Sequence, residues 1–219
     1  MSSPHVRTQA RSVNLDAPYA TVTVTNDRPL MVIADPCAIE DRQLALETAA
    51  FLRETCASLG LSAIYKSSFD KGNRTSLAGY RGPSLENGLT IPAEVREPIG
   101  LPVITDAQPP EQVPAVADVL QLQAFLCRQT DFIRAVAAAG KPMRIKKSQF
   151  WAPWAKAHDA GNERLVPVLA TVGIAAIFLK TQLPPDNESC DGPNMVPLAK
   201  LPDLLRTLHA LDRVPKETV

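Results

Sequence analysis

Short apolar runs alternate with longer segments of helical periodicity through most of the chain. The run from Leu30 to Ala34 is apolar throughout and stops at Pro36, which is typical of a strand buried on both faces. From Asp41, apolar side chains recur on one helical face as far as Leu59, and Gly60 follows as a helix-ending glycine. This stretch therefore predicts a strand, a loop and a helix.

The same pattern recurs towards the C-terminus. It predicts further strands at residues 63–66, 103–105, 119–122, 143–146 and 176–179. It also predicts helices around 111–117, from 130 to 139 and along the leucines that follow residue 201. Alternating strands and helices indicate an α/β fold whose parallel sheet is built with right-handed crossovers.

Six parallel strands can be counted in this way. A closed parallel barrel needs eight strands and about 250 residues, whereas an open doubly wound sheet can be built from six. The periodicity alone leaves both architectures open.

The N-terminal region carries a weaker strand signal. Residues 21–25 alternate β-branched side chains, and a turn at Asn26 and Asp27 separates them from the apolar run that follows. We expect a short N-terminal β-hairpin that leads into the first buried strand. Residues 1–16 lack an apolar run and are interpreted as a flexible tail, which leaves residues 17–219 as a single domain.

Composition narrows the classes of partner. The 23 basic and 23 acidic residues cancel, so no global field attracts nucleic acid or an anionic membrane. No window approaches the roughly 18 apolar residues of a membrane span. The 4 cysteines form no CxxC pair, which favours free thiols or a metal ligand in a reducing compartment. We expect a cytoplasmic protein.

The segment KSSFDKGNRTS carries the most chemistry. It starts at a predicted strand end and places Lys66, Lys71 and Arg74 among small polar residues. The carboxyl ends of parallel strands are where α/β folds build their sites, and such cations suit a phosphorylated or carboxylated substrate. A solvated basic loop is the alternative interpretation. Arg128 and Lys146 follow two other strands, and cations that converge from three strands favour a polyanionic ligand.

These segments also carry a family resemblance. KSSFDKGNRTS is followed by YRGPSLENGL and accompanied by PCAIE, TDAQ, QLQAFLCRQTD, IKKSQF and CDGPN. In this order, the motifs resemble those of 3-deoxy-D-manno-octulosonate-8-phosphate synthase. The resemblance implies a (β/α)8 TIM barrel. Between IKKSQFWAPW and the last strand, however, two strand–helix units of the family have no counterpart, so we expect an incomplete barrel without strands 6 and 7.

The resemblance implies a transferase of lipopolysaccharide sugar biosynthesis. It would condense phosphoenolpyruvate with D-arabinose 5-phosphate to 3-deoxy-D-manno-octulosonate 8-phosphate and phosphate. The residues implied for phosphoenolpyruvate are Lys66, Ser68, Arg128 and Lys146, and Gln149 is implied as a further substrate-binding residue. Those implied for the aldose phosphate are Lys71, Asn73, Arg74 and Thr75. Among these, Lys66, Lys71, Asn73 and Arg74 are the candidate catalytic residues.

The metal-dependent branch of this family uses four protein ligands, of which two have counterparts here. Cys37 matches the cysteine and Asp191 the aspartate, but Lys180 replaces the glutamate and the ligand histidine has no counterpart. A divalent metal ion is therefore left open as a cofactor of an incomplete site. A further departure is Asp35, which stands where glycine is usual before the Pro-Cys pair.

Two alternatives to the implied reaction stay open. The chain could be a catalytically impaired or inactive relative, either a binding or partner protein or the product of a gene with an internal deletion. It could also be another phosphoenolpyruvate-condensing enzyme, such as a 3-deoxyheptulosonate phosphate synthase. As partners we expect the two substrates, together with a homo-oligomer or a complete synthase subunit, and neither nucleic acid nor membrane.

Overall fold

The computed structural model describes residues 12–17, 20–72, 80–107, 111, 118–146, 174–182 and 195–217. The strands are β1 (Val13–Ala17), β2 (Ala20–Val24), β3 (Met31–Asp35), β4 (Ala63–Lys66), β5 (Val103–Asp106), β6 (Val119–Leu122), β7 (Met143–Ile145), β8 (Ala176–Gln182) and β9 (Val196–Pro197). The α-helices are α1 (Arg42–Ser58), α2 (Leu85–Glu94), α3 (Thr130–Ala138) and α5 (Leu201–Glu217). A π-helical turn, Val95–Ile99, extends α2, and a 3-10 turn, Leu198–Lys200, precedes α5.

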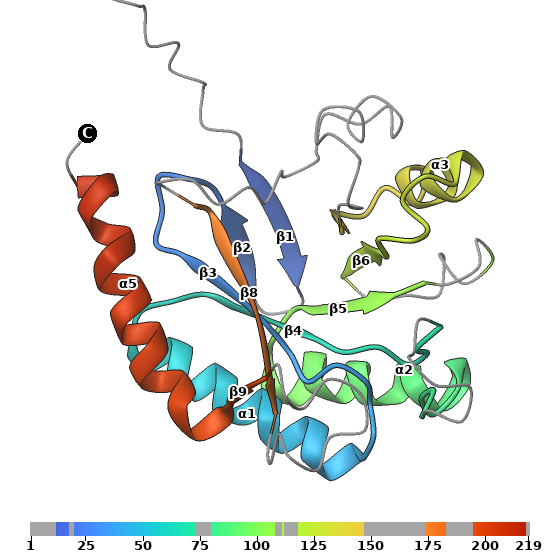
Figure 1. Cartoon of the computed structure of the whole chain (residues 1–219), viewed down its shortest axis with the longest axis horizontal. Coiled ribbons are helices and arrows are strands. Elements are labelled where there is room, and N and C mark those ends of the chain that lie inside the picture. Colours follow the sequence, from blue (N-terminus) through green and yellow to red (C-terminus); the bar gives the residue numbers. More distant parts are fainter. Residues whose placement is uncertain are drawn as a thin grey trace, which may run out of the picture.

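The parallel sheet runs in the order β7-β6-β5-β4-β3-β8-β9 (Figure 1). Strands β3 to β7 lie side by side in sequence order, and β8 returns to pair with β3 from Met31 opposite Ala176 to Asp35 opposite Lys180. A doubly wound sheet reverses its strand order near the middle, whereas a barrel pairs its last strand with its first. The sheet is therefore a curled part of a TIM barrel.

The interval between β7 and β8 explains why this barrel is incomplete. Residues 146–175, which number 30, separate the two strands along the chain. A barrel of about 250 residues uses roughly 30 residues for each strand–helix unit. The interval has room for one crossover but not for two additional strands, as expected from the sequence.

The six predicted parallel strands are all confirmed to within a few residues, and the predicted N-terminal β-hairpin is confirmed as well. Strand β2 pairs with β1 and not with residues 30–34, because β3 already has β4 on one edge and β8 on the other. Strand β1 also begins at Val13, inside the predicted tail. The division of the chain at residue 17 stays a prediction.

The predicted helices that lie within the described residues are confirmed as α1, α3 and α5. Asp41 caps α1 by accepting a hydrogen bond from the Leu44 amide at 2.9 Å, and Gly60 has a φ of 67° just after the helix. Helix α3 ends before Gly140 in the same way. The helix expected around residues 111–117 falls, apart from residue 111, outside the described residues.

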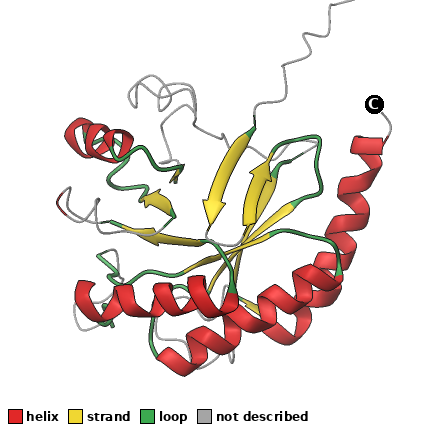
Figure 2. Cartoon of the chain, turned by 180° about the vertical axis from the view of Figure 1, so that it is seen from behind, coloured by secondary structure: helices red, strands yellow, loops and turns green. Residues whose placement is uncertain are grey.

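The strands separate two apolar cores. Helices α1, α2, α3 and α5 pack against the outer face of the sheet, where Ala34, Tyr65 and Leu122 are buried (Figure 2). The inner face buries Ile33 and Ile64 against the N-terminal hairpin. Because side chains alternate between these faces, the hairpin fills the amino-terminal end of the barrel interior and leaves the carboxyl end for other groups.

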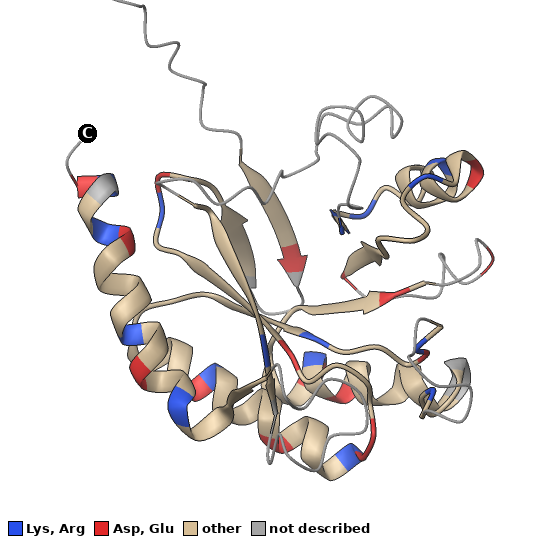
Figure 3. Cartoon of the chain, viewed as in Figure 1, with Lys and Arg blue, Asp and Glu red and all other residues tan. Residues whose placement is uncertain are grey.

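Charged residues of both signs are interspersed over the described elements, and α5 carries both along its length (Figure 3). This distribution agrees with the formal net charge of zero. Within the described part of the chain, no helix has the length and apolar character needed to cross a membrane.

Candidate active site

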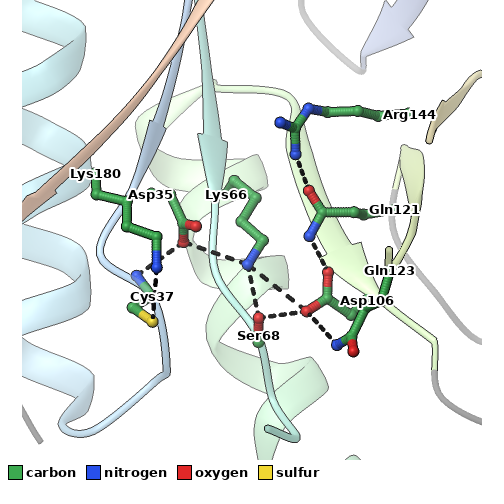
Figure 4. Close-up of polar contacts among 9 residues, drawn as sticks. All are labelled: Asp35, Cys37, Lys66, Ser68, Asp106, Gln121, Gln123, Arg144 and Lys180. Carbon is green, nitrogen blue, oxygen red and sulfur yellow. Dashed lines mark hydrogen bonds and ion pairs between the residues drawn. The ribbon is translucent and has the colours of Figure 1, made fainter. Parts of the chain in front are cut away.

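The inner face of the strands changes from apolar to polar towards their carboxyl ends. On β3, Met31 and Ile33 are followed by Asp35, and on β4, Ile64 is followed by Lys66. The same position is taken by Asp106 on β5, Gln121 on β6, Arg144 on β7 and Lys180 on β8 (Figure 4). We call these six residues, together with Ser68, Gln123, Lys71, Lys146 and Cys37 at the adjoining strand ends, the polar layer.

Lys66 lies at the centre of the polar layer and is fully buried. Its Nζ donates to Ser68 Oγ at 2.6 Å and forms ion pairs with Asp35 Oδ1 at 3.3 Å and Asp106 Oδ2 at 3.7 Å. Ser68 in turn donates to Asp106 Oδ2 at 2.6 Å. Burial favours the protonated form of Asp106, but the charge of Lys66 and the Ser68 hydrogen bond outweigh it and lower its pKa. Asp106 is therefore a carboxylate.

A line of amide hydrogen bonds extends this network to β7. Gln121 and Gln123 donate to the two oxygens of Asp106, and Arg144 Nη1 donates to Gln121 Oε1. Burial lowers the pKa of Arg144, which still remains charged because guanidinium groups do not lose their proton in proteins. A chain of contacts thus joins Arg144 to Lys66 through two side chains.

Lys146 directly follows β7 and is half-buried. Burial, followed by repulsion from Lys66, lowers the pKa of Lys146 to about 8. This group therefore titrates close to neutral pH, unlike an ordinary lysine.

Cys37, Lys71 and Lys180 form the opposite side of the polar layer. The Cys37 amide donates to Asp35 Oδ1 at 2.8 Å, and Lys180 Nζ lies 3.5 Å from Cys37 Sγ. Burial raises the pKa of the Cys37 thiol. Burial also opposes the charge of Lys71, but Cys37 and Asp35 outweigh it and raise the pKa of Lys71. Lys71 is therefore an ammonium group at neutral pH.

These residues do not fit a divalent metal. The thiol of Cys37 faces the ammonium of Lys180, and a cation bound to the sulfur would lie beside that positive charge. Among the residues that the structure describes, no group of three or more His, Cys, Asp or Glu side chains could hold a metal ion. Asp191, the other expected ligand, is outside the described residues.

The structure brings together five of the eleven site residues expected from the sequence, namely Cys37, Lys66, Ser68, Lys71 and Lys146. Arg128 is exposed in the turn that follows β6. The remaining five, Asn73, Arg74, Thr75, Gln149 and Asp191, fall outside the described residues. The roles assigned to all eleven stay predictions.

Three strand residues of the polar layer were missed in the sequence, namely Asp106, Gln121 and Arg144, and Gln123, which follows β6, was missed as well. Each of the three strand residues stands at an inward position of its strand. Asp106 and Gln121 come two residues after the apolar inward residues Ile104 and Val119, and Arg144 lies opposite Gln121 on the neighbouring strand. The signal that could have found them is the two-residue period of each strand, extended to its carboxyl end. Asp106 and Gln121 are not basic, so a pattern of cationic residues does not identify them.

The sequence of the chain is similar to that of one protein family and of several curated proteins. A sequence profile described as the DAHP synthetase I family matches residues 6–166. A 2-dehydro-3-deoxyphosphooctonate aldolase of Legionella pneumophila (strain Lens) is 40% identical, over 87% of this chain and 94% of that protein. The proteins of the same name from Alkalilimnicola ehrlichii and Magnetococcus marinus are 41% and 38% identical, over 87% and 95% of this chain and 93% and 95% of their own lengths.

The alignment with the Legionella protein is longer than the matched part of this chain. It runs over 259 positions, whereas the matched 87% of this 219-residue chain is about 190 residues. About 69 aligned positions, the difference between 259 and 190, therefore have no residue of this chain opposite them. The number of these positions is close to that of two strand–helix units of roughly 30 residues each.

Proposed function

The chain belongs to the DAHP synthetase I family, among the 2-dehydro-3-deoxyphosphooctonate aldolases, and from this membership we propose that it condenses phosphoenolpyruvate with D-arabinose 5-phosphate. The products are 3-deoxy-D-manno-octulosonate 8-phosphate and inorganic phosphate, with one water consumed. A carbon–carbon bond forms between the methylene carbon of phosphoenolpyruvate and the aldehyde carbon of the sugar. Water adds to the neighbouring carbon, which then releases phosphate.

The charge balance of the polar layer is the observation that carries this proposal. Within the described residues the layer contains five cations, Lys66, Lys71, Arg144, Lys146 and Lys180, and two carboxylates, Asp35 and Asp106. Such a surplus at the carboxyl ends of barrel strands is costly unless anionic groups neutralise it. Two phosphorylated substrates supply those groups.

Lys66 and Lys71 have the clearest roles in the proposed reaction. Lys66 is fixed by Ser68 and Asp106, so its ammonium is preorganised to hold an anionic group of phosphoenolpyruvate. Lys71 lies five residues further along the same segment and would hold the sugar phosphate or the reacting aldehyde oxygen. Holding both substrates in one orientation contributes much of the rate enhancement of a bimolecular reaction.

Turnover is tested by incubating purified chain with both substrates and measuring phosphate release and the eight-carbon product. Cooperative unfolding is confirmed first, and the assay is run with and without added divalent metal. We expect product in both cases, and a matched Lys66→Met variant should lose it. Absence of product from a folded wild-type sample rejects the proposed reaction.

A second candidate function is substrate binding without turnover. It is favoured by the Lys180 contact with Cys37 and by the pairing of Lys66 with Asp35, each of which departs from the family pattern. Calorimetric binding of phosphoenolpyruvate in the absence of product formation supports this candidate. Co-purification with a complete synthase subunit identifies a partner protein, whereas a chain that only aggregates is the remnant of a deleted gene.

The aldehyde substrate and the assembly are tested separately. Replacing arabinose 5-phosphate with erythrose 4-phosphate distinguishes the octulosonate reaction from that of a 3-deoxyheptulosonate phosphate synthase. Light scattering of the purified chain, alone and mixed with a complete synthase, tests the proposed homo-oligomer against a mixed assembly. Fractionation of cells tests the proposed cytoplasmic location.

A further inference from the structure

Arg144 and Phe178 contact each other across the interior of the curled sheet. Arg144 is on β7 and Phe178 on β8, and four strands separate β7 from β8 in the sheet order. The guanidinium carbon of Arg144 nevertheless lies 3.8 Å from the centroid of the Phe178 ring, and Lys146 Nζ lies 5.6 Å from the same centroid. One aromatic ring therefore has two cations beside it.

Two like charges this close need a negative partner. Burial opposes the charged form of both Arg144 and Lys146, and the two also repel each other. The face of Phe178 offsets part of this repulsion. Among the described residues, the ion pairs of Asp35 and Asp106 are made with Lys66 and include neither cation. Asp35 and Asp106 also attract Arg144 and Lys146, but these two carboxylates face five cations in the polar layer, and a surplus of positive charge is left for a ligand.

The arrangement is also suited to holding a ligand in a fixed orientation. Stacking on Phe178 and the hydrogen bond to Gln121 fix the position of the Arg144 guanidinium. Within the described residues, one of its five N–H donors is used in this way. Arg144, Lys146 and Phe178 are all only half-buried, so a small solute can reach them.

Lys146 is already implied for phosphoenolpyruvate by the family resemblance, and we propose that Arg144 joins it as a second cation for the phosphate of a monoester, with Phe178 holding the two cations in place. A phosphate dianion matches two adjacent cations and accepts paired N–H donors from a guanidinium, whereas a carboxylate carries a single charge. The inference rests on the proposed function and names residues that bind a phosphate of one of its two substrates. Arg144 was not among the residues expected from the sequence.

The subsite is tested by calorimetric titration of the full chain with four probes: phosphoenolpyruvate, arabinose 5-phosphate, inorganic phosphate and pyruvate. The variants are Arg144→Met, Arg144→Lys and, as a matched control, Arg134→Met on the exposed side of α3. Loss of the guanidinium should weaken inorganic phosphate and at least one phosphate monoester by about tenfold or more. Arg144→Lys should give a smaller loss, and Arg134→Met none. Circular dichroism confirms that each variant is folded.

The outcomes separate this inference from the proposed function. If a phosphate probe is weakened and no product forms in the turnover assay, the subsite stands and the reaction does not. If product forms and Arg144→Met binds every phosphate probe like the wild type, the subsite is rejected. It is also rejected if pyruvate alone is weakened, because Arg144 then binds a carboxylate, or if the wild type binds no phosphate probe. If Arg144→Met does not fold, the Arg144→Lys titrations decide in the same way.

Discussion

Asp35 and Lys66 come from adjacent parallel strands, and their side chains meet 3.3 Å apart without any exposure to solvent. The pair lies at the carboxyl end of the sheet, where the proposed substrates would bring further negative charge. Asp35 Oδ2 has no hydrogen-bond partner among the described residues. Asp35 therefore opposes the binding of an anion at Lys66 without being fully satisfied itself.

Substitution Asp35→Asn should strengthen the binding of phosphoenolpyruvate. The amide keeps an acceptor for the Cys37 amide, and Lys66 retains Asp106, so unfolding free energy should fall by no more than about 2 kcal/mol. Removing one nearby negative charge should raise affinity at least about fivefold. Calorimetry and urea unfolding measure the two effects.

The matched control for this substitution is Asp131→Asn, on the exposed first turn of α3. It removes the same charge from a surface position and should leave affinity unchanged. Equal binding by Asp35→Asn would show that the carboxylate does not oppose the anion, and weaker binding would show that it contributes to the substrate site.

Lys180→Glu should create affinity for a divalent metal. The ammonium of Lys180 contacts Cys37 Sγ, and at an effective dielectric constant near 20 each pair of unit charges about 4 Å apart costs about 4 kcal/mol. A carboxylate at this position removes the repulsion between the Lys180 ammonium and the metal ion, and it supplies an oxygen ligand for the metal. With Co²⁺ as the probe, Lys180→Glu should show a thiolate-to-metal charge-transfer band that the wild type lacks.

The additional substitution Cys37→Ser should abolish that band, which assigns it to the sulfur. A band in the wild type that is lost in the single variant Cys37→Ser would falsify the interpretation that Lys180 excludes the metal.

The sequence predicted the strands and the cationic half of the site, because both depend on local patterns. Apolar runs such as residues 30–34 identify buried strands, and Lys66 is recognised because it stands at the end of a predicted strand. Helix α2 was missed because Pro92 lies inside it, where a proline normally ends a helix. The contact of Arg144 with Phe178 could not be predicted from any local pattern. It depends on the curl of the whole sheet between strands that are not neighbours.

Affinity for phosphoenolpyruvate should fall as pH rises through about 8, the pKa of Lys146. Burial, Lys66 and Arg144 favour the neutral amine, and Asp35 and Asp106 partly oppose them. Below this pH the ammonium is present and attracts the anion. Because the unfolded-state pKa is about 10.4, the unfolded chain binds more protons between these two values, and this group makes stability rise with pH there.

The variant Lys146→Arg separates this titration from others in the site. A guanidinium stays charged throughout the range, so the decline in affinity near pH 8 should disappear. Persistence of the decline in this variant would assign it to another group.

Gly88→Ala should destabilise the protein although it lies inside a helix. An added Cβ would meet Phe69 Cβ at 2.2 Å, and Phe69 is fully buried in the segment that joins Ser68 to Lys71. We expect unfolding free energy to fall by about 1–3 kcal/mol and substrate affinity to fall with it. In an open helix the same change would stabilise by about 1 kcal/mol, so the sign measured by urea unfolding is diagnostic.

Gly60→Ala provides the comparison for Gly88→Ala. No atom lies within 4 Å of its added Cβ, but its φ of 67° disfavours alanine. It should cost about 1 kcal/mol and leave substrate affinity unchanged. A loss of affinity in both variants would show that the effect is global destabilisation and not displacement of Phe69.

Lys216→Met should weaken the junction between the last helix and the first and last long strands of the barrel. Lys216 Nζ donates to the Arg28 and Ile174 carbonyls at 2.7 and 2.9 Å and pairs with Asp212, which also accepts from the Leu30 amide at 3.0 Å. These contacts hold the segments that lead into β3 and β8. Removing the ammonium leaves the buried Asp212 carboxylate without its ion pair, and unfolding free energy should fall by about 3 kcal/mol.

The matched control for this junction is Arg213→Met, whose ion pair with Glu217 on the same helix is exposed on both sides. An exposed pair of this kind contributes less than about 1 kcal/mol. Urea unfolding of the two variants should therefore separate them clearly. Similar losses would mean that the helix holds the two strands by apolar packing alone. In that case the pairing of β3 with β8 would persist in Lys216→Met, and substrate affinity should be unchanged as well.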